Sequence, residues 1–265
     1  MRLLPLVAAL LAQPLSAHEL WIEPTDFQPE LSAPVEAHLV NGQEFKGLQL
    51  SFLPGYVARL DLSLGDAVEK VAPRIGSKPA LQAPALGDGL HVAVYQSVPA
   101  TVKYASLEKF GSFVRHKDLG DALDRHAARG LPDADFAEVY TRFSKSLIGV
   151  GSAAGADHDF GLETELVALA NPYTDDMSGG LPLRLTYRGE IRADAQVEIF
   201  DRAPSGEVTI TRPLTNADGV VTVPVTPGHH YMADAVVLRE PEGENLTGAV
   251  WESLWANLTW AVPGP

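Results

Sequence analysis

The chain has 265 residues, of which 46% are hydrophobic and 20% charged, so it is long and apolar enough to bury the core of one or two ordinary domains. Its 34 acidic residues outnumber 20 Lys and Arg, and a surface with a formal net charge of −14 repels nucleic acid and anionic lipid headgroups. The absence of cysteine excludes disulfides, thiolate metal sites and thiol nucleophiles, so any metal site must use His, carboxylates, backbone atoms or a chain terminus.

Residues 1–17 have the layout of a secretory signal peptide. Arg2 precedes the apolar run 3–11, and the small residues Ser16 and Ala17 close the segment. The run is too short to span a bilayer. We therefore expect export to the periplasm, cleavage after Ala17 and no membrane insertion of the product.

Cleavage at that point makes His18 the first residue of the mature chain. Its free α-amine and its imidazole Nδ1 could then close a six-membered chelate on one cation. Nitrogen-rich ligation suits Cu(II) or Ni(II), and one further His would complete the arrangement known as a histidine brace. The alternative is that signal peptidase leaves a histidine there by chance.

Residues 18–105 are expected to form an N-terminal β-sandwich. The segments 35–40 and 90–95 alternate apolar and polar residues with period two, and the turn residues Asn41 and Gly42 follow the first of them. Short strands at regular spacing favour an antiparallel sandwich.

The apolar period becomes helical over 106–150, where we expect a helical insertion packed on a sheet. Apolar residues recur at helical spacing up to a break near Gly130, and an aromatic stripe continues beyond it. The stripe consists of Phe136, Val139, Tyr140, Phe143 and Leu147. The glycine-containing segment 151–161 is predicted to be a linker.

Residues 162–265 return to short strands and are expected to form a second, transthyretin-like β-sandwich. The segments 181–187, 220–223 and 230–238 adjoin turn residues, and 254–262 places apolar residues on one face. The predicted fold class is therefore mainly β, with two antiparallel sandwiches of immunoglobulin or transthyretin type and a helical insertion.

Five segments resemble an exported bacterial family of unknown function that is itself similar to the periplasmic component of nickel/cobalt uptake systems. They are 18–24 (HELWIEP), 41–47 (NGQEFKG), 140–147 (YTRFSKSL), 171–173 (NPY) and 251–259 (WESLWANLT). The resemblance covers nearly all of the mature chain. It implies an N-terminal His, β-sandwich modules, handling of a transition metal in the periplasm and, as a candidate partner, a membrane metal transporter.

Seven further histidines are candidates to complete a site on His18. We rank His230, His116 and His126 first. For the two in the helical insertion, the alternative is a solvated helix residue, and His230 shares its strand entry with His229, so only one of these two can face a given side of the sheet. The others are His38 and His91 in predicted strands and His158 in the linker.

Enzyme signatures are absent: the chain has no nucleophile elbow, P-loop, dinucleotide-binding fingerprint or His-Glu-x-x-His motif. We therefore expect a non-enzymatic periplasmic protein that binds nickel, cobalt or copper and supports its uptake or delivery. One alternative is a structural or interaction module of the envelope without a specific metal. Another is a copper oxidase of the histidine-brace type, which needs a flat exposed face around His18.

Overall fold

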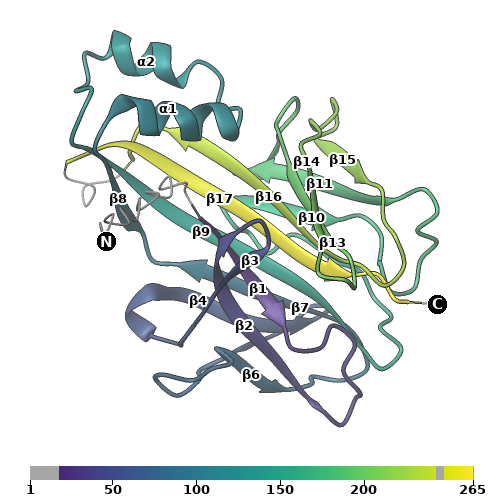
Figure 1. Ribbon diagram of the computed structural model, residues 1–265. Coiled ribbons are helices and arrows are strands. Elements are labelled where there is room, and N and C mark those ends of the chain that lie inside the picture. Colours follow the sequence, from purple (N-terminus) through teal and green to yellow (C-terminus); the bar gives the residue numbers. More distant parts are fainter. Residues whose placement is uncertain (1–17, 243–247, 265) are drawn as a thin grey trace, which may run out of the picture.

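The computed structural model describes residues 18–242 and 248–264, so the predicted signal peptide lies outside the described part. With 49% strand and 8% helix, the chain is mainly β, as predicted (Figure 1). Among the described residues, no helix is both long and apolar enough to cross a membrane.

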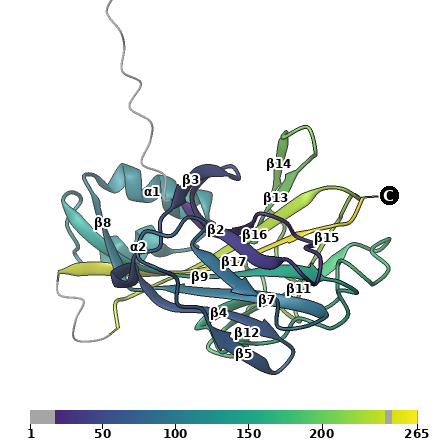
Figure 2. The same ribbon diagram turned by 90° about the horizontal axis from the view of Figure 1, so that it is seen from below.

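A nine-stranded sheet forms the centre of the molecule (Figure 1). Its strands are β4 (Val57–Leu64), β5 (Ala67–Lys70), β7 (Gly89–Ser97), β8 (Ala100–Tyr104), β9 (Phe136–Val150), β13 (Glu198–Arg202), β14 (Val208–Thr211), β16 (His230–Arg239) and β17 (Ala249–Ala261). Their order is β14-β13-β16-β17-β9-β7-β4-β5, and β8 pairs with β9 outside that path. The long strands β9 and β17 run parallel side by side, whereas the other pairs are antiparallel (Figure 2).

Two four-stranded sheets cover the faces of the central sheet. The N-terminal sheet contains β1 (Glu19–Pro24), β2 (Pro34–Gln43), β3 (Lys46–Leu50) and β6 (Leu81–Pro84), and a short 3-10 helix, η1 (Pro54–Tyr56), follows β3. The C-terminal sheet contains β10 (Thr164–Ala168), β11 (Leu181–Tyr187), β12 (Glu190–Ile191) and β15 (Val220–Val223). Alternation along β7 shows the two-sided packing: Leu90 and Val92 join the core with the C-terminal sheet, while Ala93 and Tyr95 join the core with the N-terminal sheet.

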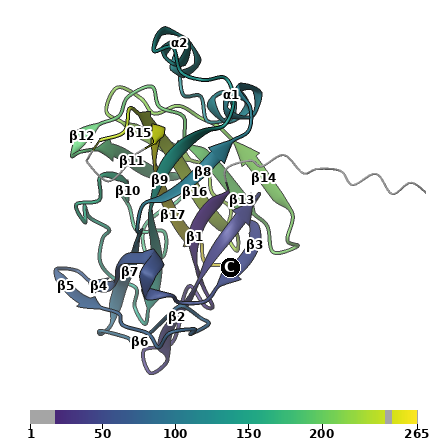
Figure 3. The same cartoon turned by 90° about the vertical axis from the view of Figure 1, so that its left-hand side faces the viewer.

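Two helices, α1 (Leu107–His116) and α2 (Ala122–Ala128), lie over one end of the central sheet (Figures 1 and 3). Ser106 caps α1 by accepting a hydrogen bond from the Lys109 amide. The helices bury Trp251 and Trp255 of β17. Leu254 and the residues two positions from it along β17 face the C-terminal sheet, so Trp255 points to the opposite face of the central sheet. The helices therefore cover the same face of the central sheet as the N-terminal sheet.

The predicted helix over the aromatic stripe is wrong, because this segment is strand β9. The central position of β9 buries both of its faces, so apolar residues occur on both and the period of two is lost. Phe143 and Leu147 face the C-terminal sheet, whereas Tyr140 packs beside the helices. The spacing that resembles one helical stripe is thus divided between two faces of a strand.

The two predicted sandwiches share the central sheet, which takes β4, β5, β7, β8 and β9 from one half of the chain and β13, β14, β16 and β17 from the other. The predicted linker 151–161 joins β9 to β10 and is itself anchored. Asp157 and Glu165 lie 2.9 Å from Lys145 Nζ, and all three side chains are buried. The segment therefore connects the central sheet to the C-terminal sheet that packs on it, rather than two separate sandwiches.

The first hairpin turns three positions later than the sequence suggests. β2 continues to Gln43, and Glu44 and Phe45 form the turn with positive φ. Gly42 is needed inside the strand because a Cβ there would lie 2.0 Å from the Lys46 carbonyl oxygen.

Trp251 provides a test of the packing under the helices. It is fully buried, and its ring stacks on Phe110 at a centroid distance of 5.7 Å. We expect Trp251→Ala to lower the free energy of unfolding in urea by about 3–5 kcal/mol, because it opens a cavity in this core. Leu48→Ala, at a side chain that is 77% exposed, should change it by less than about 0.5 kcal/mol. Equal losses in the two variants would contradict this packing.

Candidate functional site

Strand β1 is fixed on the central sheet by side-chain hydrogen bonds. One edge of β1 pairs with β2. On the other edge, alternate backbone carbonyls accept hydrogen bonds from side chains of β9 and β17, as expected when alternate carbonyls point to the same side of a strand. The acceptors are His18, Leu20 and Ile22, and the respective donors are Arg142, Ser144 and Thr259. These bonds fix the position of His18, which immediately precedes β1.

A buried ion cluster holds the next residue, Glu19. The Lys117 ammonium lies 2.9 Å from Glu19, 2.7 Å from Glu198 and 3.0 Å from Asp234. All four side chains are at least nine-tenths buried. Lys117 follows α1, so the cluster connects the helices to β1, β13 and β16.

The three carboxylates of this cluster respond differently to burial. Burial raises the pKa of Glu19 and of Asp234, and the Lys117 charge opposes that rise. Burial acts in the same direction on Glu198, but hydrogen bonds from His116 and Lys117 outweigh it and lower its pKa to about 2. Burial disfavours the Lys117 ammonium, yet the surrounding carboxylates raise the pKa of Lys117 overall.

The same three carboxylates are the one group of three or more His, Asp or Glu side chains, among those of residues 18–242 and 248–264, with donor atoms close enough to share a metal ion. Lys117 Nζ already lies within 3.0 Å of an oxygen of each. An ammonium therefore fills the place that a cation would take, and this cluster acts as an anchor.

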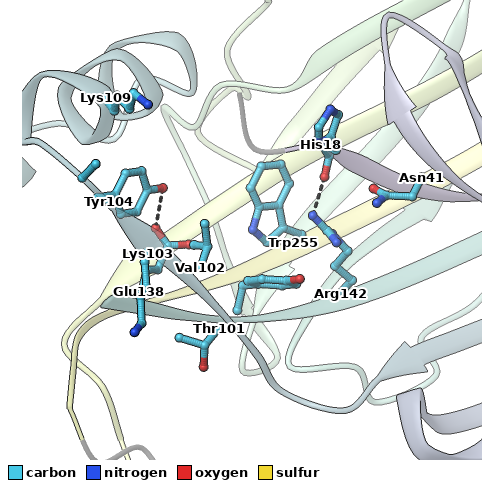
Figure 4. A pocket seen from close by; sticks show the side chains of 12 residues that line it. His18, Asn41, Thr101, Val102, Lys103, Tyr104, Lys109, Glu138, Arg142 and Trp255 are labelled. Carbon is cyan, nitrogen blue, oxygen red and sulfur yellow. Dashed lines mark hydrogen bonds between the residues drawn. The ribbon is translucent and has the colours of Figure 1, made fainter. Parts of the chain in front are cut away.

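His18 lies on a cavity of about 400 Å³ (Figure 4). The cavity opens between the start of β1, strands β8 and β9, and α1. Its lining residues are His18, Asn41, Thr101, Val102, Lys103, Tyr104, Ala105, Lys109, Glu138, Tyr140, Arg142 and Trp255. The His18 carbonyl points toward Arg142, and its ring points away from that side chain (Figure 4). His18 is exposed, so its imidazole is accessible from solvent.

Arg142 forms the base of the cavity beside His18. Its guanidinium lies 4.6 Å from the ring centroid of Tyr140 and 5.5 Å from that of Trp255. These distances are typical of cation–π contacts. Arg142 is 8% exposed, and its buried Nε has no hydrogen-bond partner among the described residues. The side chain is therefore held in place by aromatic rings, with only the His18 carbonyl as a polar partner.

Glu138 lies on the opposite wall of the cavity (Figure 4). It accepts hydrogen bonds from the hydroxyls of Tyr104, at 2.9 Å, and Ser253. Burial raises the pKa of Glu138 to about 7, although both hydroxyls and Arg142 oppose the rise. Near neutral pH, Glu138 therefore exists in both protonation states and only partly offsets the charge of Arg142.

The structure does not bring the four predicted metal-binding histidines together. His18 and His230 lie at opposite ends of β1, because His230 is adjacent to Arg202, which binds Glu23. Five residues of strand separate these ends by roughly 17 Å. Burial and the nearby Arg202 charge lower the pKa of His230.

The two histidines of the helical segment have structural partners. His116 Nε2 lies 3.2 Å from Glu198, on the outer side of the Lys117 cluster. His126 is buried, with Nε2 3.0 Å from the Pro132 carbonyl and Nδ1 accepting a hydrogen bond from Trp251. Both ring nitrogens of His126 are engaged, so we do not retain it as a candidate ligand.

The sequence does not predict the roles of Arg142, Glu138 and Lys117 in this site. A signal for the first two was present: Glu138, Arg142 and Ser144 occupy even-numbered positions of β9, which is the spacing of one strand face. The assignment of this segment to a helix hid that pattern. Lys117 carries no local signal, since its partners come from three distant strands.

Comparisons with known proteins identify a family. The family model of a domain of unknown function, DUF4198, matches residues 15–239. No curated protein matches the chain. Among solved structures, the chain is similar to a tetra-tandem repeat from the extending region of a large adhesion protein, with 12% identity and a TM-score of 0.21. That match covers 92% of this chain and 49% of the other, so the chain spans about half the length of that structure.

Lys117→Met tests the anchor of β1. The substitution leaves three buried carboxylates without their shared counter-ion, and we expect it to lower the free energy of unfolding by about 3–5 kcal/mol. Urea titration measures the change. Lys70→Met, at an exposed lysine, is the matched control and should be nearly neutral. A loss no larger than that of the control would show that the cluster does not anchor the strand.

Glu138→Gln tests the buried carboxyl through pH. The folded protein holds the Glu138 proton more tightly than the unfolded chain, because burial raises the pKa from 4.5 to about 7. The stabilising contribution is therefore complete below about pH 4.5 and is lost as the pH rises through about 7. Between these values the wild type should lose up to roughly 3 kcal/mol relative to Glu138→Gln in urea titrations. Glu108→Gln, at an exposed site, should keep the wild-type slope, and an unchanged slope in Glu138→Gln would refute the assignment.

Proposed function

The chain belongs to the DUF4198 family of domains of unknown function, and we propose that it is an exported protein that binds nickel, cobalt or copper and supports the uptake or delivery of that metal. Its compartment would be the periplasm, and a membrane metal transporter would be its partner. The metal is cargo, and no chemical transformation is assigned to the protein.

The observation that carries the proposal is the position of His18. Predicted cleavage leaves this residue first in the mature chain, and its exposed side chain lies on the cavity while Arg142 holds its carbonyl. The carbonyl bond leaves both the α-amine and Nδ1 available to one ion. Two nitrogens in a six-membered chelate suit Ni(II) and Cu(II).

The charge of the protein supports the same function. A formal net charge of −14 attracts cations over the range of a Debye length and raises their concentration near the surface. Among the described residues, no group of three or more His, Asp or Glu donors includes His18. The proposed chelate therefore keeps open positions on the ion, as a protein that must release its metal requires.

The proposal is tested by blocking the amino terminus. A mature chain that begins at His18 should bind one Cu(II) or Ni(II), and a chain that retains Ala17 should bind at least about tenfold more weakly, because its His18 nitrogen is an amide. Titration against a chromophoric competitor measures both affinities. His158→Ala, which removes a histidine outside the cavity lining, is the control and should bind like the wild type.

Two results would contradict the proposal. One is equal affinity in the chains that begin at Ala17 and His18. The other is affinity no higher than that of an unrelated protein with surface histidines, which would favour a structural or interaction module of the envelope.

A further inference from the structure

Arg142 is a buried cation without a counter-ion. Among the described residues, no carboxylate oxygen lies within 4.0 Å of the Arg142 guanidinium, the limit for an ion pair. The one hydrogen bond of the guanidinium to a described residue runs from Nη2 to the His18 carbonyl. Tyr140 and Trp255 hold the group in position. A buried charge is costly unless it is paired, so this arrangement favours an anion beside Arg142.

The rest of the cavity lining has the same sign of charge. Lys109 lies on the cavity, is exposed, and forms no ion pair with any residue of 18–242 or 248–264. Lys103 is opposite Ala137 on the other face of β8, and its ammonium points away from Glu138 and Tyr104 (Figure 4). Glu138 is the one acidic residue of the lining, and two hydroxyls already bind its carboxylate. A protein with a formal net charge of −14 thus places two cationic side chains, Arg142 and Lys109, on one cavity.

The shape and composition of the cavity favour an organic anion. Its volume of about 400 Å³ exceeds what a single inorganic ion fills, and aromatic rings form part of its wall. The two cations are separated, with Arg142 at the base and Lys109 on α1 (Figure 4). This separation suits a molecule with more than one carboxylate. Planar guanidinium groups bind carboxylates through paired hydrogen bonds.

We propose that this cavity binds a small organic polycarboxylate through Arg142 and Lys109, and that the bound anion supplies oxygen ligands to a metal ion on His18. The second part rests on the proposed function. The bound anion would supply the further metal ligands that no described residues place around His18. The cargo would then be a metal–carboxylate complex, recognised through both its metal and its negative charge.

Equilibrium dialysis of the mature chain against radiolabelled citrate in metal-free buffer tests the cavity. We expect one citrate per chain, an affinity at least about tenfold lower in Arg142→Met, and no displacement by an equal concentration of inorganic phosphate. The variant Lys109→Ser, at an exposed position, should also bind more weakly and keeps the test valid if Arg142→Met does not fold. Lys70→Ser is the control.

Three results would overturn the assignment of the cavity: no binding of one citrate per chain, binding that neither variant weakens, and equal displacement by phosphate.

Dialysis with Ni(II) and citrate together tests the second part of the proposal, in which the bound anion supplies ligands to the metal. We expect nickel to tighten citrate binding at least about tenfold in the chain that begins at His18, and not in the chain that retains Ala17.

The two proposals fail in different ways. If citrate binds without metal and nickel does not bind to the mature chain, the cavity assignment stands and the proposed metal function fails. If nickel binds to the mature chain and citrate does not, the metal function stands and the polycarboxylate site is wrong.

Discussion

One buried ammonium fixes the position of His18 and of the strand that follows it. Lys117 bonds Glu19, and Glu19 follows His18, so the first residues cannot leave the sheet without separating an ion pair that is closed to solvent. The side chains of Arg142 and Ser144 add bonds to the edge of β1 that has no partner strand. The start of β1 is therefore held through both side chains and backbone.

The cluster also explains why the cavity exists. The N-terminal sheet and the helices cover the same face of the central sheet, and the polar cluster lies where the two meet. Apolar residues pack on either side of this seam, in the core under the helices and in the core under the N-terminal sheet. Arg142 and Glu138 of the central sheet lie between these two cores, and burying their charges against apolar side chains alone would cost free energy. The cavity therefore lies beside the start of β1, because both lie where polar residues separate the core under the helices from the core under the N-terminal sheet.

The sequence predicted the mainly β class and most of the strands that alternate on one solvated face. It failed at β9, where both faces are buried and the period of two disappears. It also divided the chain at 151–161, because local composition does not reveal that strands from both halves pair in one sheet. Pairing of β9 with β17 joins residues more than one hundred positions apart and leaves no local signal.

Of the candidate site, the sequence located His18 and none of the groups that position it. The N-terminal histidine is visible because signal-peptide layout is a local pattern. Arg142 and Lys117 act through contacts with residues far away in the chain, so their roles follow only from the fold. No local pattern indicates that Trp251 and Pro132 engage the two ring nitrogens of His126.

The most direct measurement is a crystal structure of the copper-loaded mature protein with anomalous data collected at the copper edge. We expect a single strong anomalous peak bonded to the α-amine nitrogen and to Nδ1 of His18, beside the Arg142 cavity. A peak at another histidine, or a mature chain whose first residue is not His18, would contradict the central claim.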